Sequence, residues 1–101
     1  MNATTAASRL RTYLNTDNNQ VALVRPVNTR WIYVDDGACS YYLNAASVTP
    51  AKLKKLTDGG CDAYSIFCQQ TDAAKFKDLP AHTKRAALEE LGDTARNTGG
   101  W

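Results

Sequence analysis

The sequence predicts an α+β domain in which a three-stranded antiparallel meander packs against three to four helices. Three observations predict it: Val21 to Leu43 reads as three short strands rich in β-branched and aromatic residues, two turn signals separate these strands, and helix-start and helix-stop signals follow them. With a predicted fourth strand, the expected order is α-β-β-β-α-β-α-α. The 101 residues are expected to form a single domain, 1–101, with its own apolar core.

The first expected element is a helix from about Thr5 to Asn15. Its apolar residues recur at helical spacing along one side: Ala6, Leu10, Tyr13 and Leu14. The side chain of Thr4 or Thr5 can accept a hydrogen bond from the first turn and so cap the helix. The polar residues 16–20 then form a loop that leads into the first strand.

The strongest turn signal is the Asp-Gly pair at the centre of Asp35–Ala38. Such a pair is typical of a two-residue hairpin loop in which both central residues take positive φ. This loop pairs Val34 with Cys39, and Trp31 with Tyr42. An aromatic pair on neighbouring strands would form one continuous patch.

The first turn is expected at Pro26–Thr29, where proline fixes φ and asparagine tolerates a left-handed conformation. It pairs Leu23 with Ile32, and Val24 with Trp31. Together, the two turns fix which residues of the three strands share a face.

The predicted sheet has two different faces, because side chains alternate along a strand. One is mainly aliphatic and is expected to be core: Val21, Leu23, Ile32, Val34, Cys39, Tyr41 and Leu43. The other is aromatic: Ala22, Val24, Trp31, Tyr33, Ser40 and Tyr42. At least two helices should cover the aliphatic face. The sequence leaves open whether the aromatic face is exposed or is covered as a second core layer.

After the meander, the sequence predicts a second helix. Thr49 is a good N-cap, Pro50 suits the first helical position, and Gly59-Gly60 ends the helix. Leu53 and Leu56 form its apolar stripe. The next segment, from Asp62 to Gln69, predicts the fourth strand because Tyr64, Ile66 and Cys68 alternate along it. Either edge of the sheet could take this strand.

Two more helices are expected near the C-terminus. Thr71 can cap a short helix that contains Ala74, Phe76 and Leu79 and that Pro80 interrupts. The last helix runs from about His82 to Leu91, buries Ala87, Leu88 and Leu91, and stops at Gly92. Residues 93–101 form a flexible tail or are held by Trp101.

Composition excludes some classes of protein. The net charge of +2 comes from twelve basic and ten acidic residues, which is too balanced to predict DNA binding by itself. No run of about eighteen apolar residues predicts a membrane span, and the N-terminus lacks the apolar core of a signal peptide. Three cysteines form no disulfide framework. We therefore expect a cytoplasmic protein with free thiols.

No residue pattern predicts catalysis, a cofactor or a metal site. Cys61 and Cys68 are too far apart for the close ligand pairs of structural zinc sites, and no local signature links any thiol to His82. Asp35 and Asp36 are explained by turn chemistry. We therefore expect a protein that is not an enzyme.

The expected function is protein binding, as an inhibitor or regulator of a larger enzyme or complex. The candidate contacts combine aromatic residues of the sheet with charged residues of the turns: Trp31, Tyr33, Tyr42, Arg25, Arg30, Asp35 and Asp36. Tryptophan, tyrosine and arginine dominate the binding energy of many interfaces. If the last helices cover the aromatic face, the four turn residues become the candidate contact surface.

The alternative is a nucleic-acid-binding module. Its aromatic sheet face would stack on bases, and its phosphate contacts would come from Lys52, Lys54 and Lys55. The order of glycine and aromatic residues does not match the RNA-recognition sheet motif. The identity of the partner and the oligomeric state stay open.

Overall fold

The computed structural model describes residues 1–14, 23–59 and 61–101. Its main elements are α1 (Ala3–Leu14), β1 (Leu23–Pro26), β2 (Trp31–Asp35), β3 (Ser40–Asn44), α2 (Pro50–Thr57) and α3 (Ala81–Leu91). Shorter helical segments span Ala45–Ser47, Tyr64–Cys68, Phe76–Asp78 and Gly92–Arg96. The predicted α+β class and the antiparallel meander are therefore confirmed.

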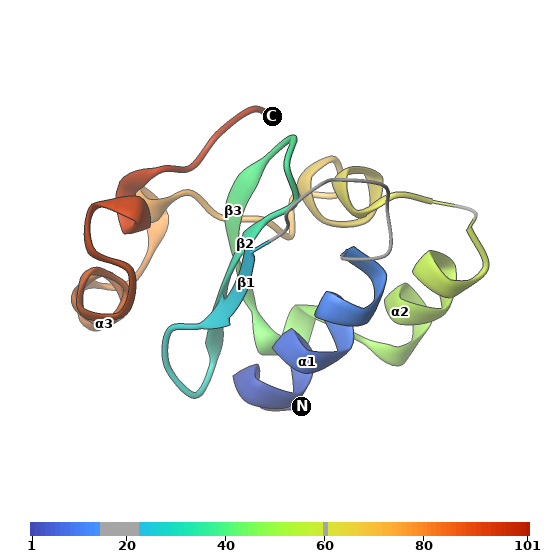
Figure 1. The fold of residues 1–101 in the computed structure, drawn as a ribbon, viewed down its shortest axis with the longest axis horizontal. Coiled ribbons are helices and arrows are strands. Elements are labelled where there is room, and N and C mark those ends of the chain that lie inside the picture. Colours follow the sequence, from blue (N-terminus) through green and yellow to red (C-terminus); the bar gives the residue numbers. More distant parts are fainter. Residues whose placement is uncertain (15–22, 60) are drawn as a thin grey trace.

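The three strands form one antiparallel sheet in the order β1-β2-β3. Helices cover both faces, with α1, α2 and residues 64–68 on one side and α3 on the other (Figure 1). The first side buries an aliphatic core, and the second side buries a smaller aromatic one. No helix in the described ranges is long and apolar enough to cross a bilayer.

The hairpin between β2 and β3 forms, but its loop lies one residue later than predicted. Asp36 N–H donates to Cys39 O over 3.1 Å, so the turn is centred on residues 37 and 38. The Asp36 carboxylate closes it by accepting the N–H groups of Ala38 and Cys39 at 2.9 and 2.8 Å. Only Gly37 in this loop has a positive φ, 92°. The Asp36 side chain therefore accepts the hydrogen bond that a backbone carbonyl would accept in the predicted turn type. As a result the strand register shifts by two residues, and Tyr33 pairs with Tyr42.

The first hairpin differs from its predicted register by three residues. Val24 pairs with Val34 and Arg25 pairs with Tyr33, because the loop is held one residue later, with Val27 N–H donating to Trp31 O over 2.9 Å. An odd shift moves every side chain of a strand to the other face. Val24 is consequently buried in the aliphatic core, and the predicted core residue Leu23 is exposed. Val21 and Ala22 lie outside the described residues.

The aliphatic core joins β2 and β3 to α1. The helix presents alanines to the sheet, and they let the two elements approach closely; its buried residues are Ala3, Ala6, Ala7 and Leu10. It begins two residues before the predicted start because Asn2, rather than Thr4 or Thr5, is the cap. Asn2 Oδ1 accepts the N–H of Thr5 at 2.9 Å.

The predicted fourth strand is wrong. Tyr64–Cys68 is a π-helical segment in which Gln69 N–H donates to Tyr64 O over 2.9 Å. Its buried residues are Ile66, Phe67 and Cys68, and Ala63 just before it is also buried. Burial of Ala63, Ile66 and Phe67 follows helical spacing, whereas the exposed Tyr64 breaks the alternation on which the predicted strand depended. The Asp62 carboxylate favours the helix by accepting the N–H of Ser65 at 2.8 Å.

The aromatic face is a second core layer. Tyr33 and Tyr42 are fully buried, with ring centroids 5.1 Å apart. Their hydroxyls donate to Asn97 O at 3.0 Å and Ala95 O at 2.6 Å. The segment after α3 therefore satisfies both phenols, and α3 contributes Ala87, Leu88 and Leu91 to the same cluster. Burial raises the pKa of both tyrosines.

The outer edge of β3 is occupied by two short pieces of chain. Tyr42 exchanges backbone hydrogen bonds of 2.9 Å with Ala74, and Ser40 exchanges bonds of 3.0 and 2.9 Å with Gly99. Trp101 Nε1 also donates to Ser40 O over 3.2 Å. An exposed edge invites pairing with another chain, so these bridges protect the sheet. Ala74, which was predicted to lie in a short helix after Thr71, is thus paired with β3. Of that predicted helix, only Phe76–Asp78 is helical.

The remaining helix signals are confirmed. Thr49 Oγ1 accepts the N–H of Lys52 at 3.3 Å, and Pro50 is the first residue of α2. Gly59 follows the helix with a φ of 71°. Likewise, α3 stops at Gly92, whose φ is 61°. Both helices end where a left-handed residue is required.

Candidate functional site

The aromatic residues predicted as contacts do not form a surface. Tyr33 and Tyr42 have no exposed area, and Trp31 is partly buried against the same cluster. Trp31 pairs with Asn44 rather than with Tyr42. Of the two alternatives that the sequence left open, the structure shows the second core layer, because the C-terminal helices cover this face.

The charged turn residues lie at opposite ends of β2. Arg30 is in the loop before the strand, and Asp35 and Asp36 are at its other end, roughly 16 Å away for five extended residues. Arg25 forms a half-exposed ion pair of 3.5 Å with Glu90, on the face opposite to the one predicted from its register. The structure therefore does not bring these four residues together in one contact surface.

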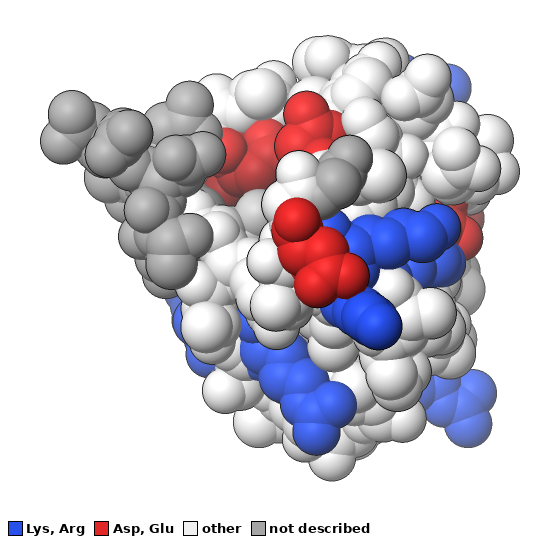
Figure 2. Space-filling view, turned by 90° about the vertical axis from the view of Figure 1, so that its right-hand side faces the viewer, with Lys and Arg blue, Asp and Glu red and all other residues white. Residues whose placement is uncertain are grey.

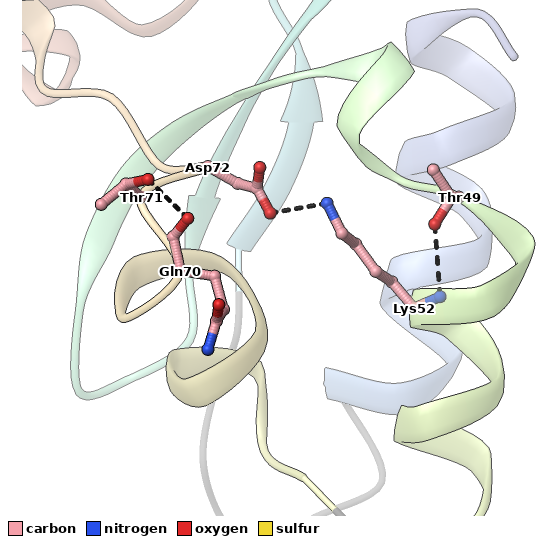
Figure 3. Close-up of polar contacts among 5 residues, drawn as sticks. All are labelled: Thr49, Lys52, Gln70, Thr71 and Asp72. Carbon is pink, nitrogen blue, oxygen red and sulfur yellow. Dashed lines mark hydrogen bonds and ion pairs between the residues drawn. The ribbon is translucent and has the colours of Figure 1, made fainter.

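The three lysines of α2 have different environments. Lys52 Nζ lies 2.6 Å from Asp72 Oδ2, and Figure 3 shows the lysine reaching from α2 to the segment after residues 64–68. Lys54 and Lys55 are exposed. Figure 2 shows basic side chains gathered on this side of the molecule, with acidic side chains beside them. Acidic side chains thus interrupt the basic surface. Lys52 connects α2 to the segment that contains Asp72.

Beside this ion pair lies a tight turn at Thr71. Thr71 has a φ of 65°, the one positive value at a non-glycine residue in the described chain, and its hydroxyl donates to Gln70 O over 2.5 Å. The Lys52–Asp72 pair lies directly after this turn (Figure 3). The turn leads the chain from the π-helical segment toward the edge of β3.

An open pocket of about 490 Å³ lies on the side of the sheet covered by α1 and α2. Four segments line it: the end of α1, the β2–β3 loop, the end of α2 and the residues before the π-helical segment. The lining combines apolar, aromatic and acidic side chains, among them Tyr13, Leu14, Leu56, Tyr64, Asp36 and Asp62. A second pocket of about 380 Å³, beside Met1 and Arg30, has neither aromatic nor acidic side chains in its lining.

The two carboxylates of the pocket are held by backbone N–H groups. Asp36 Oδ1 accepts two of them in the β2–β3 loop, and Asp62 Oδ1 accepts that of Ser65 at 2.8 Å. The bonds from Ser65 lower the pKa of Asp62. Burial raises the pKa of the Cys39 thiol, and the charges of Asp36 and Asp62 raise it further. Both carboxylates line the same pocket and give it negative charge.

Aromatic and apolar side chains form the rest of the wall. Tyr64 is 40% exposed, which is unusual for so large a side chain in this protein. Tyr13 accepts a hydrogen bond of 2.8 Å from the Thr57 hydroxyl, and this contact connects α1 to α2. Tyr13 and Leu56 also pack on the aliphatic core, so the wall rests on a rigid base.

Of the pocket residues, the sequence pointed only to Asp36 as a contact. Asp62 was missed because its segment was assigned to a strand. The available signal was an acidic residue three positions before Ser65, which is typical of a helix N-terminus.

The cysteines and the histidine lie apart. Cys39 and Cys68 are buried in the aliphatic core, whereas Cys61 is exposed at the pocket. His82 is exposed on α3, across the sheet. Within the described ranges, no group of three or more histidine, cysteine, aspartate or glutamate side chains is placed to hold a metal ion.

The thiols are expected to react at very different rates. Burial raises the pKa of Cys68 to about 12, so at pH 8 roughly one Cys68 in ten thousand carries the reactive thiolate. An aromatic disulfide reagent should titrate Cys61 in the native protein and all three cysteines in denaturant. Rapid reaction of all three without denaturant would contradict the buried placement of Cys39 and Cys68.

Comparison of the chain with protein-family models, with curated proteins and with solved structures gives no match. The function is therefore argued from the pocket and its surroundings.

Proposed function

We propose that the chain is a small, non-catalytic protein-binding module that inhibits or regulates a larger protein or complex. The observation that carries this proposal is the pocket, where the exposed ring of Tyr64 stands beside two carboxylates and apolar side chains. Exposed aromatic residues that border a hollow are typical anchors of protein interfaces. We therefore propose the pocket, rather than the aromatic sheet face, as the contact surface. Asp36 is the one residue that belongs to both the pocket and the contacts expected from the sequence.

Charge favours a protein over a nucleic acid as the partner at this site. Asp36 and Asp62 line the pocket, and their carboxylates repel phosphates. Lys52, which the nucleic-acid alternative requires, is paired with Asp72. Lys54 and Lys55 are exposed and are the residues that favour the alternative.

The proposal includes no catalysis and places the protein in the cytoplasm. The absence of catalysis is supported by the position of His82, which lies on α3, across the sheet from the buried thiols of Cys39 and Cys68. Nucleophilic catalysis by a thiol needs a base in contact with it. The three free thiols support the second part, since thiols persist in a reducing compartment.

Capture from an extract of the expressing cells, with and without nuclease, tests the proposal. We expect a protein partner that survives nuclease treatment, whose purified form binds the wild type directly. Tyr64→Ala should weaken that binding about 30-fold, the effect of an aromatic hot spot of about 2 kcal/mol. Leu23→Ala is the matched control, because Leu23 is a similarly exposed apolar residue on the other side of the sheet.

Two results would contradict the proposal. Equal losses in Tyr64→Ala and Leu23→Ala would remove the pocket from the interface. Nucleic acid in the eluate, lost when Lys54 and Lys55 are changed to glutamine, would favour the alternative.

A further inference from the structure

We infer that the pocket binds an arginine side chain presented by the protein partner. This inference rests on the proposed function and specifies the chemistry that the site recognises. It follows from four features of the pocket: its charge, the orientation of its carboxylates, its aromatic wall and a buried hydroxyl below the Asp36 loop.

The charge of the pocket is not balanced by an ion pair among the described residues. The ion pairs within the described ranges join Arg25 to Glu90, Lys52 to Asp72 and Arg96 to Asp93. Neither Asp36 nor Asp62 takes part in one. Two carboxylates that line one pocket, neither of them in an ion pair with a described residue, attract a cationic group from outside.

The carboxylates are oriented in advance. The backbone bonds to Asp36 both end on Oδ1, and the Ser65 N–H also donates to Oδ1 of Asp62. The other oxygen of Asp36, Oδ2, takes neither of these two backbone hydrogen bonds. Because one oxygen fixes the side chain, the second can accept a charge-assisted bond without loss of rotamer freedom.

The walls fit a long cationic side chain rather than a small ion. Tyr64 and Tyr13 present rings on which a guanidinium can stack, and Leu14 and Leu56 offer apolar surface to the methylene stem. Arginine suits such a site better than lysine, because its planar group stacks and donates to two acceptors at once. The volume of about 490 Å³ falls in the range of ligand pockets.

A buried hydroxyl next to the Asp36 loop supports the same site. Tyr41 is fully buried, and its hydroxyl has no hydrogen-bond partner in the described part of the chain. Burial raises the pKa of this hydroxyl, and the charge of Asp36 raises it further. Buried polar groups are nearly always paired, so the unpaired hydroxyl of Tyr41 leaves an incomplete polar network in the core near Asp36.

The test uses N-acetyl-arginine-methylamide as the probe and amide NMR spectra of the whole chain as the readout. We expect saturable shifts at the amides that bind the two carboxylates, those of Ala38, Cys39 and Ser65. The citrulline analogue, which has the same shape without the charge, should bind at least tenfold more weakly. The lysine analogue should also bind more weakly than the arginine probe.

Charge-removing variants locate the binding. Asp36→Asn and Asp62→Asn each keep an oxygen for the backbone N–H groups, so the loops should stay folded while affinity for the probe falls about tenfold. Asp78→Asn is the control, because it removes the same charge from an exposed residue outside the pocket. Unchanged amide dispersion shows that each variant is folded.

The outcomes separate this inference from the proposed function. Absence of shifts with the arginine probe, equal binding of citrulline, stronger binding of lysine, or an equal loss in Asp78→Asn would each overturn the arginine site. A partner that still requires Tyr64 would then leave the protein-binding proposal standing. Conversely, saturable arginine binding that depends on Asp62, without any protein partner, would separate the site from that proposal.

Discussion

Replacing Tyr42 with alanine is expected to lower the free energy of unfolding by about 3–5 kcal/mol, the usual cost of truncating a large buried aromatic side chain. Tyr42 is fully buried at the centre of the aromatic layer, with its ring 5.1 Å from that of Tyr33 and 6.4 Å from that of Phe76. Its hydroxyl donates to Ala95 O at 2.6 Å. The truncation would therefore leave a cavity and an unpaired carbonyl together. Urea denaturation followed by circular dichroism measures the loss.

Two variants divide this effect into its parts. Tyr42→Phe keeps the ring and removes the hydroxyl, so it should cost only about 1–2 kcal/mol, the price of leaving the Ala95 carbonyl unpaired. Tyr64→Ala removes an aromatic ring that is 40% exposed and should change stability by less than about 1 kcal/mol. If Tyr42→Ala cost no more than Tyr64→Ala, the second core layer would be contradicted.

Local chemistry explains why the helix boundaries could be predicted. Thr49 and Pro50 fix the start of α2, and Gly59 fixes its end, because each acts on the backbone within one turn. The same holds for Gly92 at the end of α3. These signals depend on neighbouring residues alone, and the structure confirms all of them.

Strand register was predicted less well because it depends on side-chain bonds in the turns. Asp36 and Asn28 each accept two backbone N–H groups, and these bonds place both loops one residue later than the turn residues alone suggest. In the second hairpin the register shift is even, so the predicted faces of β2 and β3 survive. In the first hairpin the shift is odd, and the face of β1 is reversed.

The pocket could not be predicted from the sequence because its walls come from four separated segments. Tyr13 and Tyr64 are fifty-one positions apart, and nothing local relates them. The strand assigned to Asp62–Gln69 also hid the acidic residue that completes the site. Fold class follows from local periodicity, whereas this site follows from the way α1, α2 and the π-helical segment pack on the sheet.

Gly100→Ala is expected to be the most damaging single change in the C-terminal segment. A Cβ at this position would lie 2.6 Å from the backbone oxygen of Ala38, and the φ of 93° strains any residue other than glycine. Because the contact is with backbone, no side chain can move aside to relieve it. We expect a loss of about 2–3 kcal/mol, the upper part of the range for a strained position.

The structural consequence should be local as well as energetic. Moving residue 100 away from Ala38 would break the bonds that Gly99 and Trp101 make with Ser40, and so uncover one end of the β3 edge. The emission of Trp101 should then shift to longer wavelength. Gly59→Ala is the matched control, because its φ of 71° is strained but no atom lies within 4 Å of the added Cβ. It should cost about 1–2 kcal/mol and leave the emission unchanged. Equal losses in the two variants would mean that the Ala38 contact does not hold the segment in place.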